Sequence, residues 1–327
     1  MNCEYCFRQL FRLFRHSLIH SITHSKLIPN LPHIADLLKT QGYITEPAVT
    51  MAVYLSMQLQ KPLLIEGPAG VGKTEIAKVM ARALDTDLIR LQCYEGLDAS
   101  HALYEWNYQR QLLHLKMLET RQGTPGQVDA LEEEIFGEKF LMKRPLLQAI
   151  THHKSPVLLI DEVDRADEEF ESFLLEVLSD WQITIPEIGT IKATHIPQVI
   201  VTGNRVRELS EALRRRCLYL WIDYPDYDKE LAIVRGKVPQ ISQQLAEQIC
   251  RFMQELRQLR LEKTPGIAET IDWATALATL HYDHLPKDII EQTLGVILKD
   301  WKDTRTAQLS LSELYEKMGV VSKMEDL

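Results

Sequence analysis

The chain has 327 residues, 45% hydrophobic and 25% charged, which is typical of a globular protein with one large or two medium domains. Its formal net charge of −9 argues against a protein that holds nucleic acid over a broad basic surface. No apolar run is long enough to predict a transmembrane helix. The cysteine count is odd, at five, and three of these cysteines are far apart in apolar settings. We therefore expect reduced thiols and a cytoplasmic location.

The first 26 residues differ from the rest of the chain in charge. They hold four Lys/Arg and one Glu, a formal charge of +3, with phenylalanines and arginines at helical spacing. Such a basic amphipathic helix can lie on a membrane surface or dock on a partner. A second interpretation is a zinc-finger template, C-x2-C-x13-H-x3-H, formed by Cys3, Cys6, His20 and His24. A zinc finger places its cysteines on a hairpin, but nothing between Cys6 and Leu18 breaks a helix. We therefore expect residues 1–30 to be a poorly ordered extension.

Strands and helices alternate from residue 31 to residue 225. Residues 34–60 predict two helices around a turn at Gly42. Five short apolar segments predict buried strands, at 62–66, 88–92, 156–160, 198–202 and 217–221. Alternation of this kind indicates a parallel sheet with helices on both faces. We predict an α/β domain with a five-stranded parallel sheet sandwiched by helices.

Three further segments complete the predicted organisation. Residues 93–150 form a long insertion, and residues 181–197 alternate apolar and polar side chains around Gly189, which predicts a hairpin. Apolar residues at helical spacing then predict a small all-α domain over 226–300. The polar stretch 301–327 is expected to be a loose tail with one short helix.

The segment "EGPAGVGKT" (66–74) contains the phosphate-binding pattern G-x-x-x-x-G-K-T between an apolar strand and an amphipathic helix. In this motif the backbone N–H groups and the helix N-terminus surround phosphate oxygens. We expect Lys73 to reach the β- and γ-phosphates of ATP and the Thr74 hydroxyl to ligate Mg²⁺. The predicted nucleotide-binding residues are Gly67, Pro68, Ala69, Gly70, Val71, Gly72, Lys73 and Thr74.

Two later strands end in polar residues suited to the same chemistry. In "VLLIDEVDRAD" (157–167), Asp161 is the expected Mg²⁺ ligand and Glu162 the base that polarises a water for in-line attack. In "VIVTGNR" (199–205), Asn204 is expected beside the γ-phosphate, where it would orient that water. The order strand–P-loop–helix, then strand–Asp–Glu, predicts a Mg²⁺-dependent ATPase.

These motifs resemble an AAA+ ATPase: GPAGVGKT, LLIDEVD, TGNR and LRRRC occur in that order before a helical region. Three stretches resemble the MoxR branch more closely, and within it the CoxD-like ATPases: "KPLLIEGPAGVGKTEIAK", "LRRRCLYLWIDYPDYDKE" and "TPGIAETIDWATAL". The resemblance covers about residues 31–300. It implies a ring, usually a hexamer, with ATP at each subunit interface.

The resemblance also implies roles for individual residues. Arg216 matches the arginine finger, which would reach the γ-phosphate bound to the neighbouring subunit. Tyr43 and Ile44 would flank the adenine. The stretch "TPGIAETIDWATAL" contains no arginine, so no sensor-2 residue is assigned. The insertion is expected to face the pore of the ring or the substrate. For the hairpin, contact with the substrate and a plain connection between strands are weighted equally.

The function implied by the resemblance is an ATP-driven remodelling chaperone in enzyme maturation or metal-centre assembly. Its expected partners are a von Willebrand factor A domain protein and a client enzyme. A nucleic-acid motor or loader is an alternative, but the insertion has six Lys/Arg and nine Asp/Glu, which suits a phosphate backbone poorly. A slowly hydrolysing nucleotide-dependent switch is the other alternative. The combination of Glu162, Asn204 and Arg216 favours real turnover over that switch.

Overall fold

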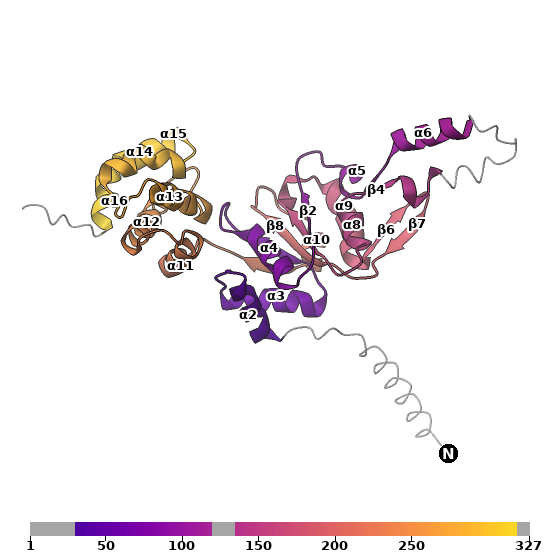
Figure 1. Cartoon of the computed structure of the whole chain (residues 1–327), viewed down its shortest axis with the longest axis horizontal. Coiled ribbons are helices and arrows are strands. Elements are labelled where there is room, and N and C mark those ends of the chain that lie inside the picture. Colours follow the sequence, from indigo (N-terminus) through magenta and orange to yellow (C-terminus); the bar gives the residue numbers. More distant parts are fainter. Residues whose placement is uncertain (1–29, 120–134, 319–327) are drawn as a thin grey trace, which may run out of the picture.

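The computed structural model describes residues 30–119 and 135–318 (Figure 1). Two bodies follow each other along the chain, first an α/β domain and then a bundle of helices. The zinc ligands suggested at Cys3, Cys6, His20 and His24 lie outside the described residues. Within the described ranges, no group of three or more His, Cys, Asp and Glu side chains is placed to hold a metal ion.

The α/β domain is built on a five-stranded parallel sheet in the order β2-β5-β8-β1-β9. This confirms the predicted fold class, and each strand lies within one residue of its predicted bounds. Apolar residues suit these strands because helices cover both faces of the sheet. The strands are β1 (Leu63–Glu66), β2 (Leu88–Gln92), β5 (Val157–Asp161), β8 (Gln198–Gly203) and β9 (Leu218–Trp221).

Helices cover both faces of the sheet, and the sheet lies between two apolar clusters. Alternate residues of β1 enter opposite clusters, with Leu63 and Ile65 in one and Leu64 in the other. This is the period of two expected for a strand. One face is covered by α2 (Leu31–Thr40), α3 (Pro47–Leu59) and α4 (Lys73–Ala83), and the other by α8 (Pro145–Ile150), α9 (Glu168–Asp180) and α10 (Glu211–Arg216).

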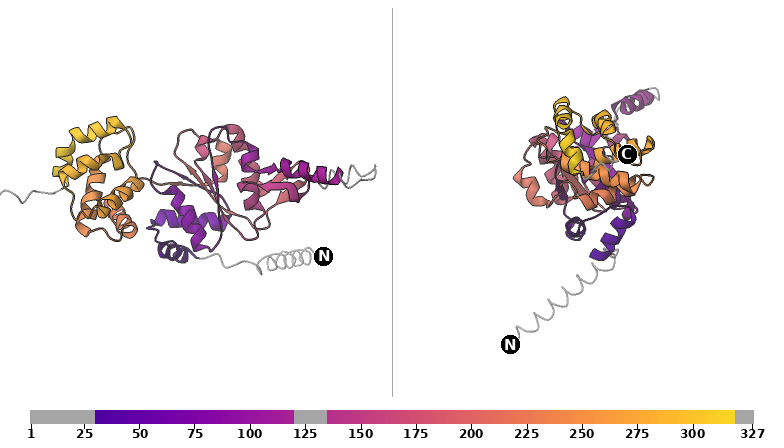
Figure 2. Two further views of the ribbon diagram at one scale, coloured as in Figure 1. Left: turned by 45° about the horizontal axis from the view of Figure 1, so that its top comes forward. Right: turned by 90° about the vertical axis from the view of Figure 1, so that its left-hand side faces the viewer.

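The insertion and the predicted hairpin lie at one end of this domain, away from the helical bundle (Figures 1 and 2). The hairpin consists of β6 (Gln182–Ile185) and β7 (Gly189–Lys192), with a turn that places Gly189 at φ +93°. The insertion contributes a second antiparallel pair, β3–β4. Its described elements are α5 (Ala99–Ala102), β3 (Tyr104–Trp106), α6 (Tyr108–Glu119), η1 (Glu138–Phe140) and β4 (Leu141–Lys143).

The C-terminal body is all helical and extends further than expected. The short helix expected in the tail from residue 301 is present at 311–317, and a second helix precedes it where a loose segment was expected. Both pack onto the bundle, and Ala307, Leu311 and Leu314 are buried in its core. Leu311 and Leu314 are three residues apart on one helix and so share a face of it, while Ala307 belongs to the helix before. The helices are α11 (Tyr227–Lys237), α12 (Gln243–Leu256), α13 (Ile267–Thr279), α14 (Lys287–Ile297), α15 (Trp301–Leu309) and α16 (Leu311–Lys317). In the described part of the chain, no helix has the length and apolar character needed to span a membrane.

A buried ion pair joins three elements of the bundle. The Glu230 carboxylate accepts two hydrogen bonds from the Arg257 guanidinium, at 2.6 and 2.7 Å, and a third from the Thr270 hydroxyl at 2.7 Å. Glu230 and Arg257 side chains are 0% and 5% exposed. Arg257 also donates to the carbonyl oxygens of Pro265 (2.9 Å) and Gly266 (3.4 Å), so the pair fixes the loop that leads into α13.

Candidate functional site

The phosphate-binding loop connects β1 to α4 in the predicted context. A Cβ atom on Gly67 would lie 1.9 Å from the carbonyl oxygen of Ile222, so glycine is required there by close packing. Gly70 and Gly72 have φ of +75° and +90°, the left-handed region that favours glycine. The loop ends at the start of α4, whose first N–H groups have no acceptor within the helix and therefore suit an anion.

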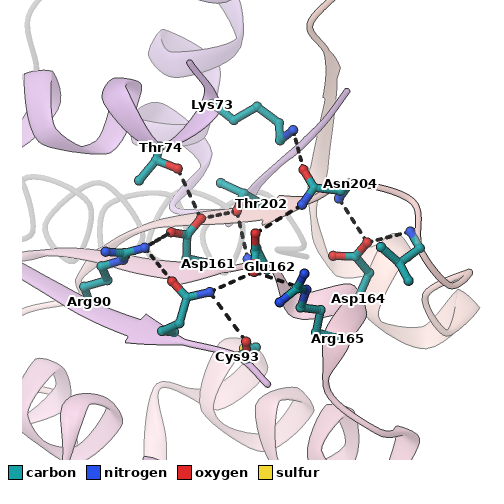
Figure 3. A network of polar contacts seen from close by, with 12 residues as sticks. Lys73, Thr74, Arg90, Cys93, Asp161, Glu162, Asp164, Arg165, Thr202 and Asn204 are labelled. Atoms are coloured by element: carbon teal, nitrogen blue, oxygen red, sulfur yellow. Dashed lines mark hydrogen bonds and ion pairs between the residues drawn. The ribbon is translucent and has the colours of Figure 1, made fainter. Parts of the chain in front are cut away.

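Lys73 lies across this loop. Its ammonium donates to the carbonyl oxygens of Gly67 (2.8 Å) and Pro68 (2.6 Å) and to Oδ1 of Asn204 (2.7 Å). Burial lowers the pKa of Lys73, while the nearby carboxylates act in the opposite direction. The contact with Asn204 joins the P-loop to the end of the central strand β8 (Figure 3).

Asp161 ends β5 and is 4% exposed. Its Oδ1 atom accepts hydrogen bonds from the hydroxyls of Thr74 (3.2 Å) and Thr202 (2.6 Å), and its Oδ2 atom pairs with the Arg90 guanidinium. The pairing of Thr74 with a buried carboxylate gives two hard oxygen donors, the set that Mg²⁺ prefers. The donor set therefore fits the metal assignment made from the sequence.

Glu162 follows Asp161 in a left-handed backbone conformation, with φ +55°. Strained conformations of this kind cluster at functional sites, since the surrounding structure has to hold them. The Glu162 carboxylate accepts hydrogen bonds from Asn204 Nδ2 (3.3 Å) and Gln92 Nε2 (3.1 Å), and Arg165 lies 3.3 Å away. The predicted catalytic residues Lys73, Glu162 and Asn204 thus form one connected network (Figure 3).

Sequence reasoning did not assign Arg90, Gln92 or Thr202 to this network. Arg90 and Gln92 are exposed, alternating with buried residues on β2, so they share the face that meets Asp161 and Glu162. The alternation in "LIRLQ" was visible in the sequence. Which strand would lie beside β5 was not, and therefore neither were the partners of these side chains.

Asp164 holds the backbone of Asn204 through a hydrogen bond. It is 3% exposed, and its Oδ2 atom accepts the backbone N–H groups of Asn204 (3.0 Å) and Val206 (2.7 Å). Its Oδ1 atom is buried and has no hydrogen-bond partner in the described structure. Asp164 therefore sets the position of the Asn204 backbone.

Replacing Asp164 by alanine is expected to lower kcat about tenfold and to leave KM for ATP within about threefold. The reason is that Asn204 loses its anchor while the phosphate-binding loop stays intact. Asp164→Asn keeps one oxygen acceptor and is expected to recover most of kcat. Steady-state kinetics on both variants check this, and an Asn variant as slow as the Ala variant would contradict a role through hydrogen bonding.

A pocket of about 580 Å³ lies over the loop, between the α/β domain and the helical bundle. Tyr43 and Ile44 line it, as expected of residues near the base, and burial raises the pKa of the Tyr43 hydroxyl. The bundle adds side chains that the sequence did not predict there, namely Lys229, Ile233, Lys237, Ile267, Ala268 and Ile271.

Helix α13 contacts the phosphate-binding loop directly. The backbone N–H groups of Ile267 and Ala268 donate to the Gly70 carbonyl oxygen at 3.0 and 3.3 Å. A Cβ atom on Gly266 would come within 2.7 Å of the Gly70 carbonyl, so only glycine allows this approach. The stretch that lacks a sensor-2 arginine thus still reaches the site, through its backbone.

Arg216 lies apart from the other predicted site residues. It ends α10, is exposed, and does not line the pocket of its own chain. Its Nη1 atom donates to the Ala212 carbonyl oxygen (3.0 Å), and its Nε atom donates to the Ser179 hydroxyl. Arg215 pairs with Glu211 on the same helix, and Arg214 lies over the Tyr219 ring.

The glycine loop, its lysine and the paired acids at the ends of parallel strands define a P-loop nucleoside triphosphatase. Residues 62–217 match the family model of the AAA domain, dynein-related subfamily. The matched stretch is similar to an AAA domain, and the chain is an ATP hydrolase.

Two curated relatives are staphylococcal proteins described as uncharacterized. One, from Staphylococcus haemolyticus, is 28% identical over 228 residues, which is 68% of this chain and 78% of that protein. The other, from Staphylococcus aureus, is 28% identical over 206 residues, 61% of this chain and 69% of that protein. Among solved structures, the RuvB Holliday junction branch migration motor of Thermotoga maritima has 18% sequence identity and a TM-score of 0.44, covering 86% of this chain and 76% of that one.

Proposed function

We propose that the chain is a Mg²⁺-dependent ATPase that works as a ring, most simply a hexamer, in which Arg216 completes the site of a neighbouring subunit. The observation that carries this is the location of Arg216. It is exposed and outside the pocket where Lys73, Thr74, Asp161, Glu162 and Asn204 meet. A finger that acts on a neighbour requires this placement, because it has to project from its own subunit.

Each residue of the pocket has a role in this proposal. The loop from Gly67 to Thr74 binds the phosphates, and Lys73 exchanges its contacts with loop carbonyls for phosphate oxygens. Thr74 and Asp161 hold Mg²⁺, which supplies positive charge at those oxygens. Glu162 takes the proton of the attacking water, and Asn204 orients that water. Tyr43 and Ile44 flank the base.

The cellular role we propose is that of a remodelling chaperone. The resemblance to MoxR-type and CoxD-like ATPases supports a role in enzyme maturation or metal-centre assembly, with a von Willebrand factor A domain protein as partner and an enzyme as client. The acidic balance of the insertion, six Lys/Arg against nine Asp/Glu, favours protein clients over nucleic acid.

The ring proposal is tested by ATP hydrolysis per subunit against protein concentration, with mass measured alongside. We expect specific activity to rise as rings assemble, and Arg216→Ala to assemble but to lose about 10³-fold in kcat. Arg215→Ala, on the same helix but paired with Glu211, is the matched control and is expected to retain activity.

A mixing experiment distinguishes action on a neighbour from action within one chain. Arg216→Ala and Glu162→Gln are each expected to be inactive alone. In a mixed ring, an Arg216→Ala subunit beside a Glu162→Gln subunit has its own Glu162 and receives its neighbour's Arg216. Recovered hydrolysis on mixing supports the proposal, whereas two variants that stay inactive together contradict it.

A further inference from the structure

A second hollow lies on the α/β domain. The insertion and the hairpin that contribute to its lining lie at the end of the domain opposite the helical bundle (Figure 2). It is a groove of about 700 Å³ between three parts of the chain: the insertion around β3, helix α9, and the hairpin strand β6. It shares no lining residue with the nucleotide pocket. The groove is therefore a separate feature that nucleotide binding does not explain.

The groove is acidic. Glu105, Glu176 and Glu187 line it, and none of its lining residues is Lys, Arg or His. Glu105 is paired with Arg144, which lies outside the groove. Glu176 accepts a hydrogen bond only from the neutral Thr184 hydroxyl, and no ion pair among the described residues involves Glu176 or Glu187. Two carboxylates without a cationic partner favour a cationic occupant.

The groove is also aromatic. Tyr108 and Phe173 line it and are 67% and 43% exposed. Trp106, only 5% exposed, contributes an indole N–H that is buried and finds no hydrogen-bond partner in the described residues. Exposed aromatic rings are typical of protein interfaces, and they accept both apolar side chains and the cation of an arginine or lysine.

Two strands that line the groove have unused edges. Within the described residues β3 pairs with β4 alone, and β6 pairs with β7 alone. No hydrogen bond among the described residues uses the backbone groups on the other edge of either strand, and an extended polypeptide can add to such an edge. These two strand edges therefore suit an extended segment better than a folded surface.

From the charge, the rings and the strand edges together, we infer that this groove binds an extended segment of a partner protein in which arginine or lysine stands next to aromatic or aliphatic side chains. The inference rests on the proposed function, since a remodelling ATPase has to hold its client. It adds the chemistry of the segment held and the residues that hold it.

The test uses two fluorescein-labelled synthetic peptides and the full chain, without nucleotide. In one peptide arginine alternates with leucine and phenylalanine, and in the other glutamate replaces every arginine. Fluorescence anisotropy is expected to show the arginine peptide binding at least about tenfold more tightly, with an affinity that falls as salt rises.

Two groove variants and one control sharpen the test. Glu187→Lys is expected to lower the affinity for the arginine peptide about tenfold and to reduce the salt dependence of its binding. Phe173→Ser is expected to lower that affinity about fivefold and to leave the salt dependence unchanged, because the substitution removes a ring and no charge. Glu291→Lys, an exposed charge reversal on α14, is the matched control and is expected to bind like the unmodified protein.

Equal affinity for the two peptides, or equal losses in Glu187→Lys and Glu291→Lys, would overturn the inference. Displacement of the arginine peptide by a peptide of residues 1–26 would assign the groove to this chain's own basic segment, and displacement by a single-stranded oligonucleotide would assign it to nucleic acid. Either result overturns a partner protein as the occupant. Peptide binding needs no hydrolysis, so an absence of ATP turnover contradicts the proposed function and leaves this measurement intact.

Discussion

Glu162→Gln is expected to reduce ATP hydrolysis by about 10² to 10⁴-fold while ATP binding stays within about threefold. The change removes the proton acceptor and one charge. The amide keeps the size of the carboxylate, and its one oxygen can still accept from either Asn204 or Gln92, which in the unmodified protein donate to the two carboxylate oxygens at 3.3 and 3.1 Å. Nucleotide contacts of the phosphate-binding loop are not touched, so the variant should trap ATP.

Single-turnover hydrolysis and equilibrium binding of a fluorescent ATP analogue measure the two effects separately. Glu169→Gln, an exposed glutamate in the first turn of α9, is the control and is expected to hydrolyse ATP normally. Hydrolysis by Glu162→Gln at the rate of the unmodified protein would show that another group takes the proton.

Arg257→Met is expected to lower the free energy of unfolding by about 3–5 kcal/mol. The Glu230 carboxylate is 0% exposed and would be left buried without the guanidinium that pairs with it. The variant also removes two hydrogen bonds to the carbonyls of Pro265 and Gly266. Because that loop leads into α13, weaker ATP binding is expected along with the loss of stability.

Urea unfolding followed by circular dichroism measures the first effect. Lys302→Met breaks the exposed pair with Glu262 and is the matched control, expected to change the free energy of unfolding by less than about 1 kcal/mol. The double variant Arg257→Met with Glu230→Met is expected to recover much of the loss, since no buried charge remains. A single variant as stable as the unmodified protein would contradict the reasoning.

The sheet could be predicted because its signals are local. Each strand is a short apolar run between polar turns, and each lies within one residue of its expected bounds. The P-loop and the acids after β5 were equally predictable, because their chemistry depends on neighbours along the chain. Lys73, Thr74, Asp161 and Asn204 all meet in one network.

Contacts between distant segments could not be predicted in this way. Arg90 reaches Asp161 because β2 lies beside β5 in the sheet, a fact of strand order that β2's own sequence does not contain. The approach of Gly266 to Gly70 joins the two bodies of the protein. The stretch "TPGIAETIDWATAL" showed that it holds no arginine, but not which part of the site it would contact.

The C-terminal helices show a different reason why structure could not be predicted from the sequence. Residues 301–318 are polar overall, and this composition favoured a loose tail with one short helix, so α15 was not predicted. The few apolar positions, Ala307, Leu311 and Leu314, are enough to dock α15 and α16 once the rest of the bundle offers a complementary surface. Burial on a partner surface decided the structure there, as tertiary packing does for most short helices.

The contact between Gly70 and the first turn of α13 has a thermodynamic consequence. Two hydrogen bonds tie the Gly70 carbonyl of the phosphate-binding loop to the helical bundle, so a shift of the bundle changes the loop that ATP would occupy. Linkage of this kind is reciprocal. Any protein that grips the bundle in one orientation will change the affinity for ATP, and ATP will change the affinity for that protein by the same factor.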